Sequence, residues 1–249
     1  MAPYARCVVS AGWGWRETGW SGGGPNWDHG TTGNPRETHD VETTQWTEIS
    51  SPEELRALIG APTARVAGKD RKRLHEHDRS WLAASPFCLV ATSNADGSCD
   101  VSPKGDPAGF TVVLDDTTIA IPERPGNRRT DGFHNILSNP HVGLIYLVRG
   151  RGDTLRINGR ARLVRDAAFF DDMVVKGHRP VLALVVEIEQ VFYHCSKAFL
   201  RSRLWDPATW GQVELPTRAA ISKTLERPDD SLDELNRYYG PDYEKGLYA

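Results

Sequence analysis

Hydrophobic and polar positions change character along the chain and predict helical segments on either side of a strand-rich segment. Ser51-Pro52-Glu53-Glu54 has the capping serine, first-turn proline and early acids of a helix start. Residues 70–84 have apolar positions that predict a second helix, which ends before Pro86. After residue 86, short apolar runs alternate with turn residues, which is typical of strands.

Two hairpins are predicted in this strand-rich segment. The first joins Phe87–Ser93 to Ser98–Ser102 through Asn94-Ala95-Asp96-Gly97, and the second joins Phe110–Leu114 to Thr117–Ile121 through Asp115-Asp116. His141–Val148 and Val181–Ile188 are almost continuously apolar, so we expect small helices or a partner subunit to cover their second face. Thr154–Arg165 alternates apolar and polar residues instead. Hairpin spacing with few long helices predicts a mainly β protein, a closed or nearly closed antiparallel barrel.

The pattern divides the chain into four expected parts. Residues 1–47 are rich in glycine and tryptophan but have no period, so we expect a disordered or weakly ordered extension. Residues 48–85 hold the N-terminal helices, and residues 86–215 hold the barrel. Residues 216–249 form a helical tail, where Thr217–Glu226 and Ser231–Tyr239 read as helices.

Composition narrows the class of protein. The chain has 249 residues and a formal net charge of −3, so nothing global favours nucleic acid or an anionic membrane. No apolar run is long enough to span a bilayer, and no secretory signal is recognisable. The four cysteines are scattered without a C-x-x-C pair, and the pattern predicts no metal site. We therefore expect a reduced, cytoplasmic protein.

The stretch from Ile121 to Pro140 contains the clearest candidates for binding residues. It joins a strand to a helix through a loop that contains Arg124, Arg128 and Arg129. A helix start presents unpaired N–H groups and the positive end of a dipole, and guanidinium groups add donors for phosphate oxygens. The arrangement favours a phosphorylated cofactor, and the residues alone leave a solvated basic loop as an open alternative.

Three passages together resemble the pyridoxamine 5′-phosphate oxidase-like family of FMN-binding split barrels. They are Asp100-Val101-Ser102-Pro103-Lys104-Gly105-Asp106 followed by Gly109-Phe110, the Arg128-Arg129 loop with Asn139-Pro140 after it, and Leu155-Arg156-Ile157-Asn158-Gly159. The likeness covers roughly residues 74–210. It implies a six-stranded antiparallel split barrel with a helical C-terminal segment. It also implies a homodimer with one FMN in each cleft at the interface.

Site residues follow from that resemblance by position. Arg128 and Arg129 would grip the FMN phosphate, Ile121 and Pro122 would lie along the ribityl chain or ring edge, and Thr154 would contact the ring. Residues 101–104 would line the isoalloxazine. The implied cofactor-binding set is Val101, Ser102, Lys104, Ile121, Pro122, Asn127, Arg128, Arg129 and Thr154. The resemblance implies an FMN-dependent oxidoreductase with no assigned catalytic residue.

The chain departs from the oxidase pattern in two places. Residues 123–127 replace the usual loop, and the C-terminal segment reads His194-Cys195-Ser196-Lys197-Ala198 in place of the oxidase substrate signature. These departures indicate a different FMN-binding branch. Lys197 and Arg201, four residues apart on one helix face, are candidates to close the cleft over flavin or an anionic substrate. Two alternatives stay open: a flavin-binding store or sensor without turnover, and a deazaflavin-dependent reductase that would use Arg156, Arg160 and Arg162.

Overall fold

The computed structural model describes residues 46–211 and 214–248, and the chain divides into two units at Gly60. The predicted extension over residues 1–47 lies almost wholly outside the described residues. In the first unit, α1 (Pro52–Ile59) begins as predicted, because the Ser51 side chain accepts a hydrogen bond from the Glu54 N–H. The second unit, from Ala61 onward, holds the sheet and every other helix in the described residues.

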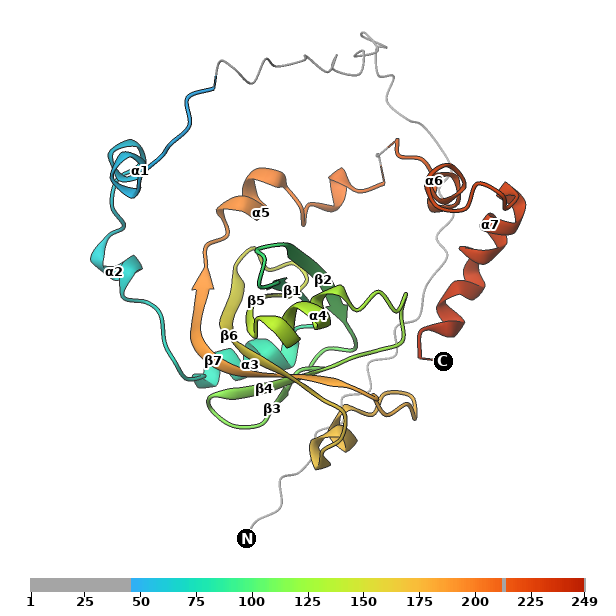
Figure 1. Ribbon diagram of the computed structural model, residues 1–249, viewed down its shortest axis with the longest axis horizontal. Helices are drawn as coiled ribbons and strands as arrows, with labels where there is room; N and C mark the ends of the chain where they lie inside the picture. Colours follow the sequence, from blue (N-terminus) through green and yellow to red (C-terminus); the bar gives the residue numbers. More distant parts are fainter. Residues whose placement is uncertain (1–45, 212–213, 249) are drawn as a thin grey trace. The chain divides into compact units, whose positions relative to one another are not determined.

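The elements of the second unit are shown in Figure 1. Its helices and 3₁₀ turns are α2 (Ala64–Ala67), α3 (Glu76–Ala84), α4 (Asp131–Ser138), η2 (Ala168–Met173), α5 (Lys197–Ser202), η3 (Pro207–Thr209), α6 (Arg218–Leu225), α7 (Leu232–Tyr238) and η4 (Pro241–Gly246). Its strands are β1 (Phe87–Ser93), β2 (Cys99–Gly105), β3 (Val112–Val113), β4 (Thr118–Pro122), β5 (His141–Leu147), β6 (Thr154–Val164) and β7 (Ala183–His194).

All seven strands belong to one antiparallel sheet in the order β2-β1-β5-β6-β7-β4-β3. Both predicted hairpins are present, as β1–β2 and β3–β4. The mainly antiparallel fold is confirmed, with seven strands where six were expected. Strand β2 lies at one edge of the sheet, and the short β3 lies at the other. An edge position lets β2 include Pro103, which pairs with Leu89 without disrupting a second neighbour.

The main core fills one face of the curled sheet. Its largest fully buried side chains include Tyr146, Leu144, Leu155 and Ile157 from β5 and β6. A close backbone approach fixes the β6–β7 pairing at Gly159, where a Cβ atom would lie 2.0 Å from the Glu187 carbonyl oxygen. The register shifts by one residue at this point. Only glycine fits such an approach.

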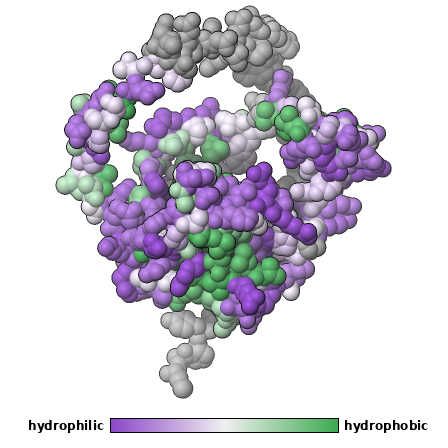
Figure 2. All heavy atoms as spheres, in the orientation of Figure 1, coloured by the Kyte–Doolittle hydropathy of each residue, from purple (hydrophilic) through white to green (hydrophobic). Residues whose placement is uncertain are grey.

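The second face of β7 is covered within the chain. Phe170 and Met173 of η2 pack with Ala183 and Val185 of β7 and with Ala120 of β4. We expected small helices or a partner subunit as this cover, and η2 is a small helical element that supplies it for β7. The position of η2 was not predicted, because residues 168–173 are too few to show a helical period. On the face seen in Figure 2, an apolar area lies on the barrel amid a mainly hydrophilic surface.

The second predicted helix begins later than expected. It was predicted over residues 70–84, but α3 starts at Glu76. The Asp78 carboxylate accepts a hydrogen bond from the His75 N–H at 2.7 Å, which caps the helix there. Arg71 pairs instead with Val191 of β7 through both backbone groups, at 3.1 and 2.7 Å. A tertiary strand-like contact therefore replaces the first turns of the predicted helix.

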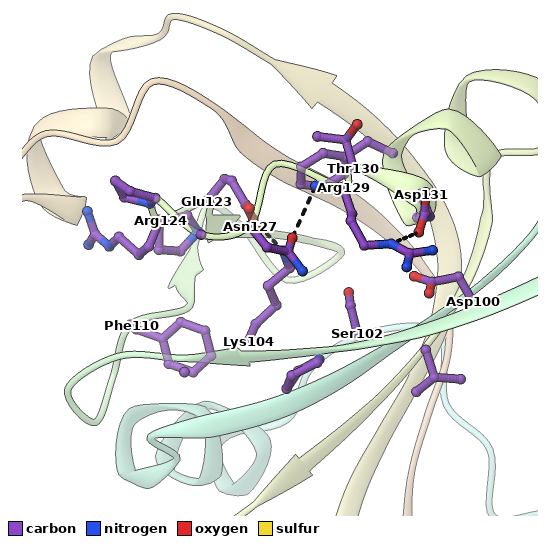
Figure 3. Close-up of a pocket in the computed structure, with 18 residues that line it drawn as sticks. Asp100, Ser102, Lys104, Phe110, Glu123, Arg124, Asn127, Arg129, Thr130 and Asp131 are labelled. Atoms are coloured by element: carbon purple, nitrogen blue, oxygen red, sulfur yellow. Dashed lines mark hydrogen bonds and ion pairs between the residues drawn. The ribbon is translucent and has the colours of Figure 1, made fainter. Parts of the chain in front are cut away.

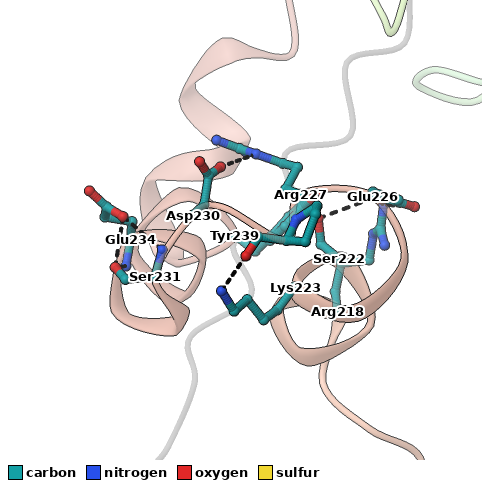
Figure 4. Close-up of polar contacts among 10 residues, drawn as sticks. Arg218, Ser222, Lys223, Glu226, Arg227, Asp230, Ser231, Glu234 and Tyr239 are labelled. Carbon is teal, nitrogen blue, oxygen red and sulfur yellow. Dashed lines mark hydrogen bonds and ion pairs between the residues drawn. The ribbon is translucent and has the colours of Figure 1, made fainter.

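Helices α6 and α7 pack against one another, and α7 packs against η4. Both lie within the predicted ranges. Thr217 accepts a hydrogen bond from the Ala220 N–H at the start of α6, and Ser231, the predicted cap of α7, forms a reciprocal capping pair with Glu234. Surface ion pairs link Arg218 to Glu226 and Arg227 to Asp230 (Figure 4). No helix in the described residues is both long and apolar enough to span a membrane.

Candidate functional site

A cleft of about 480 Å³ lies between edge strand β2 and the segment that leads from β4 into α4 (Figure 3). In the sheet, β2 is an edge strand and β4 is next to the other edge strand, β3. Residues of both walls line it: Asp100 to Gly105, Phe110, Pro122 to Asn127, and Arg129 to Phe133. Its volume falls within the roughly 300–1,000 Å³ of small-molecule and cofactor sites.

Strand β2 forms one wall through its alternation. Asp100, Ser102 and Lys104 are half-buried, and the residues between them are exposed. Because successive side chains point to opposite faces, these three polar groups share the face toward the cleft. Val101 also borders the cleft, but it belongs to the other set and is 59% exposed. The wall therefore offers polar groups where an apolar ring contact through Val101 was expected.

The opposite wall ends in a group of backbone N–H donors, which we call the α4 cradle and define as residues 127–132. Arg128 and Thr130 have left-handed backbones, with φ of 60° and 51°. Each such non-glycine residue costs roughly 1–2 kcal/mol. Among the described residues, the N–H groups of Asp131 and Gly132 have no hydrogen-bond acceptor, whereas the Phe133 N–H donates to the Thr130 carbonyl at 2.9 Å. Left-handed residues next to right-handed ones turn N–H groups toward a common point. This backbone shape can receive an anion.

Gly132 lets the cradle approach β2. A Cβ atom at this position would lie 3.0 Å from the Asp100 Oδ2 atom and 3.4 Å from the Thr92 Oγ1 atom. The start of α4 therefore packs almost directly on β1 and β2. The helix is also tied to β1 by the buried Asn135 side chain, which donates to Thr92 Oγ1 at 3.0 Å.

Each cation that lines the cleft faces a carboxylate. Lys104 pairs with Glu123, with both side chains mostly buried, and the Lys104 ammonium lies 4.8 Å from the Phe133 ring centroid. Arg129 Nε donates to Asp131 Oδ2 at 2.7 Å, although its side chain is 75% exposed and free to turn. The lining charges of these two pairs cancel, so an anion binds only if it competes with Glu123 or Asp131.

Arg124 contributes differently from the other two arginines of the loop. Its guanidinium points away from Lys104 (Figure 3) and forms an ion pair with Asp106 at 2.6 Å. It also donates to the Met173 carbonyl at 2.6 Å. The sequence grouped Arg124 with Arg128 and Arg129, but these contacts are 18 and 49 residues away and no local spacing reveals them.

The structure brings together only part of the residue set implied by the resemblance. Those that line the cleft are Val101, Ser102, Lys104, Pro122, Asn127 and Arg129. Arg128 is exposed beside it, whereas Ile121 is only 1% exposed and belongs to the core. Thr154 is buried at the start of β6 and pairs with His194. Lys197 and Arg201 lie on α5 and do not line this cleft within one chain.

Sequence reasoning missed three acidic lining residues: Asp100, Glu123 and Asp131. The signal for Asp100 was its place two residues before Ser102, on the same face of a strand. Asp131 follows the arginine pair at the first position of a helix, where acids are common for reasons of the dipole alone. A binding role therefore could not be separated from helix stabilisation in the sequence.

A second hollow of about 480 Å³ lies near the start of β6 and the end of β7. Its residues are His77, Ser80, Trp81, Ala84, Val148, Arg151, Asp153 and Tyr193. The Arg151 guanidinium lies over the Trp81 ring at 5.1 Å. Burial, together with the nearby Asp78 carboxylate, raises the pKa of Tyr193 to about 12. The phenol is therefore protonated at neutral pH.

Comparison with solved structures found several partial likenesses. HupZ from Group A Streptococcus is 19% identical, with a TM-score of 0.40, over 48% of this chain and 93% of that chain. An FMN-binding protein from Syntrophomonas wolfei is 12% identical, with a TM-score of 0.37, over 48% and 89%. A protein described as an F420 reductase is 16% identical, with a TM-score of 0.35, over 49% and 98%.

A search of curated protein sequences gave no significant match. In contrast, residues 74–195 match the family model described as pyridoxamine 5′-phosphate oxidase. The matched residues run from just before α3 to the end of β7 and contain both walls of the cleft. The resemblance drawn from the three sequence passages is thus confirmed at the level of the family. Through residues 74–195, the chain belongs to the pyridoxamine 5′-phosphate oxidase-like family of split barrels.

Proposed function

We propose that the chain is an FMN-dependent oxidoreductase that binds FMN in the β2–α4 cleft and acts on a small molecule. The α4 cradle carries this proposal, because two strained residues sit beside free helix N–H groups and a movable arginine. Strain of this kind persists at ligand sites where the surrounding structure holds it. A phosphate dianion is the ligand class that these donors fit best.

The two arginines differ in what binding would require of them. Arg129 must turn from Asp131 to reach an anion above the cradle, and its high exposure makes that turn easy. Arg128 is exposed and borders the same turn. Together they would supply the charge that the cleft lining lacks, since the other lining cations are paired with Glu123 and Asp106.

In this proposal, Lys104 would set the local charge beside the flavin ring. FMN, when bound, supplies the hydride and electron chemistry, while the protein orients it and sets the local charge. A lysine ammonium in the same cleft would stabilise negative charge on a reduced ring. Glu123 holds that ammonium over the Phe133 ring, so its position is set before any ligand enters.

The first experiment identifies the ligand. We expect the purified protein to show a flavin spectrum, and the compound released by heating to have the mass of FMN. A deazaflavin mass would favour the reductase alternative, and a colourless protein that takes up neither compound would contradict the proposal. Anaerobic reduction by a nicotinamide, followed by reoxidation with candidate acceptors, then separates an enzyme from a flavin store.

The second experiment tests the cradle. Arg128→Ala with Arg129→Ala removes two contacts worth roughly 1.5–3 kcal/mol each, so FMN affinity should fall by about two to four decades. Arg160→Ala with Arg162→Ala removes the same charge from exposed positions on β6 and should leave FMN affinity unchanged. Equal losses in both double variants would mean that net charge, rather than the cradle, governs binding. Loss of deazaflavin binding in the control alone would favour the deazaflavin alternative.

A homodimer with the cleft at its interface completes the proposal. The family resemblance supports it, and so does the position of Lys197 and Arg201 on α5, which do not line the cleft of one chain. These residues could reach a flavin only from a second subunit. Light scattering on flavin-loaded and flavin-free protein tests this, and a monomer at micromolar concentration when loaded would contradict it.

A further inference from the structure

The loop of residues 123–130 has little backbone support of its own. It contains no helix or strand. Among the described residues, its backbone N–H groups make only two hydrogen bonds: Glu123 to the Leu182 carbonyl at 2.8 Å, and Arg129 to Asn127 Oδ1 at 3.0 Å. Yet this loop holds the two left-handed residues of the α4 cradle, Arg128 and Thr130. Side-chain contacts must therefore fix its shape.

Arg124 supplies those contacts. Its side chain is 12% exposed, and its guanidinium donates to Asp106 Oδ2 at 2.6 Å and to the Met173 carbonyl at 2.6 Å. A third, longer bond reaches the His178 carbonyl at 3.3 Å. Arg124 thereby ties the start of the loop to the turn after β2 and to the connection between η2 and β7. A planar guanidinium with several fixed donors suits this task better than a lysine.

Tyr248 closes the other side of Arg124. Its phenol donates to Asp106 Oδ1 at 2.5 Å, while Arg124 occupies Oδ2 of the same carboxylate. The Tyr248 ring stacks on the His178 ring with centroids 5.9 Å apart, and the Arg124 guanidinium lies 5.5 Å from the Tyr248 centroid. These groups form a closed set around Arg124, which we call the Arg124 latch: Asp106, Arg124, His178 and Tyr248.

Asp106 connects Arg124 to Tyr248 within the latch, because its two oxygens accept hydrogen bonds from both. Its side chain is 1% exposed, and a buried carboxylate is tolerated only when its oxygens are bonded to donors. One donor is the arginine, and the other is a tyrosine 142 residues away. The hydrogen bond to Asp106 raises the pKa of Tyr248, so the phenol keeps its proton at neutral pH. Without Tyr248, one carboxylate oxygen loses its partner and the Arg124 guanidinium loses its cover.

We propose that Tyr248 and Asp106 are positioning residues, which hold Arg124, and through it residues 123–130, in the shape that receives a phosphate. Neither residue lines the cleft. Their effect reaches it because Arg124 directly follows Glu123, the partner of Lys104, and precedes the cradle by three residues. The inference rests on the proposed function for the identity of the ligand, but the latch itself is a property of the unliganded chain.

The test uses the full chain with Tyr248→Ala, Tyr248→Phe and the matched control Tyr243→Ala. Tyr243 comes from the same segment, but its ring packs edge-to-face with the Tyr238 ring, with centroids 5.6 Å apart, rather than against the latch. The first measurement is hydrogen exchange of the peptide over residues 122–131 without added flavin. We expect faster exchange by about tenfold in Tyr248→Ala, a smaller increase in Tyr248→Phe and none in the control.

The second measurement is FMN affinity by quenching of flavin fluorescence. A lost cation–π contact and a lost hydrogen bond to a charged group should raise the FMN Kd by about 5- to 20-fold in Tyr248→Ala. Tyr248→Phe keeps the ring and should recover part of that loss. Melting temperature should fall by only a few degrees in the two Tyr248 variants, because the buried core stays intact while one buried Asp106 oxygen loses its donor, and it should stay at the wild-type value in Tyr243→Ala.

The outcomes separate the latch from the proposed function. Unchanged exchange in Tyr248→Ala overturns the latch, whatever the flavin data show. Faster exchange with unchanged FMN affinity overturns the positioning role. A wild-type chain that binds no FMN overturns the proposed function alone, because the exchange measurement still reports on the latch without any ligand. Faster exchange and weaker FMN binding, both absent from Tyr243→Ala, support the proposal.

Discussion

The barrel and the α6–α7 helix pair are held together by different means. In the barrel, long strands pair across the sheet and close on a core whose central side chains are fully buried. In the helix pair, Leu235 is the one large apolar side chain that is fully buried, and caps and surface ion pairs supply much of the remaining order (Figure 4). The barrel therefore depends on contacts between distant residues, and the helix pair on contacts within a few residues.

This difference decides where a small change has a large effect. A close-packed sheet has no room for an added atom and transmits a local clash along its pairing. A short helix with a solvated surface can absorb a change within one turn. The cleft is built on the barrel side of this contrast, but its cradle is a loop that a distant tyrosine and carboxylate hold in place. It thus combines a rigid wall with an adjustable one.

The largest expected effect comes from filling the β6–β7 contact. Gly159→Ala would place a Cβ atom 2.0 Å from the Glu187 carbonyl oxygen, so the two strands must separate. We expect the free energy of unfolding to fall by about 3–5 kcal/mol. Gly246→Ala in η4, where an added Cβ meets nothing within 4 Å, is the control and should change it by less than about 0.5 kcal/mol.

Chemical denaturation of both glycine variants measures the difference. Similar values for the two would show that β6 and β7 can separate at little cost. In that case the contrast between the barrel and the helix pair would be wrong. Loss of soluble protein for Gly159→Ala but not for Gly246→Ala would support the prediction, because both variants add one methyl group and are expressed in the same way.

The next effect concerns a buried carboxylate in the first turn of α3. Asp78 is fully buried, and Arg71 donates to both of its oxygens. Burial alone would raise its pKa, but the hydrogen bonds from Arg71 and from the His75 N–H lower it below the usual range. Because the folded-state pKa lies below the unfolded one, this stabilisation is complete at neutral pH. It is lost as the pH falls from about 4 through the folded-state value.

Asp78→Asn should therefore cost about 2–4 kcal/mol of unfolding free energy at pH 7. The gap between the variant and the wild type should narrow as the pH falls below about 4. Denaturation at a series of pH values, with both proteins measured side by side, gives this difference directly. A gap that stays constant down to low pH would mean that shape, rather than charge, makes Asp78 matter.

The same contrast explains what the sequence could predict. The caps at Ser51 and Ser231 were predicted because a capping pattern lies within four consecutive residues. Both hairpins were predicted for the same reason. The start of α3 was misplaced because Arg71 pairs with Val191, 120 residues away. No periodicity within the helix reports on such a partner.

The candidate site was likewise predictable only where its residues follow a local sequence pattern. Ser102, Lys104 and Arg129 line one cleft, and the sequence could single them out because strand alternation and a strand-to-helix loop are local patterns. Their cofactor-binding role stays a prediction. The part played by Arg124 was not, since its partners Asp106, Met173 and Tyr248 come together only in the folded chain. The resemblance also carried over Thr154, which pairs with His194 away from the cleft.

The smallest effect tests whether the helix pair and the cleft are independent. Ser231→Ala removes the side chain that caps α7 and should cost about 1 kcal/mol locally. We expect faster hydrogen exchange in residues 232–238 and no change in residues 122–131, because the latch partners of Tyr248 all belong to the barrel side. Thr217→Ala removes the matching cap of α6 and serves as the control for a lost cap as such.

Faster exchange in residues 122–131 in Ser231→Ala would show that Tyr248 needs an ordered α7 to stay in the latch. The two regions would then form one cooperative unit, and the division drawn between them would fail at the one contact that joins them.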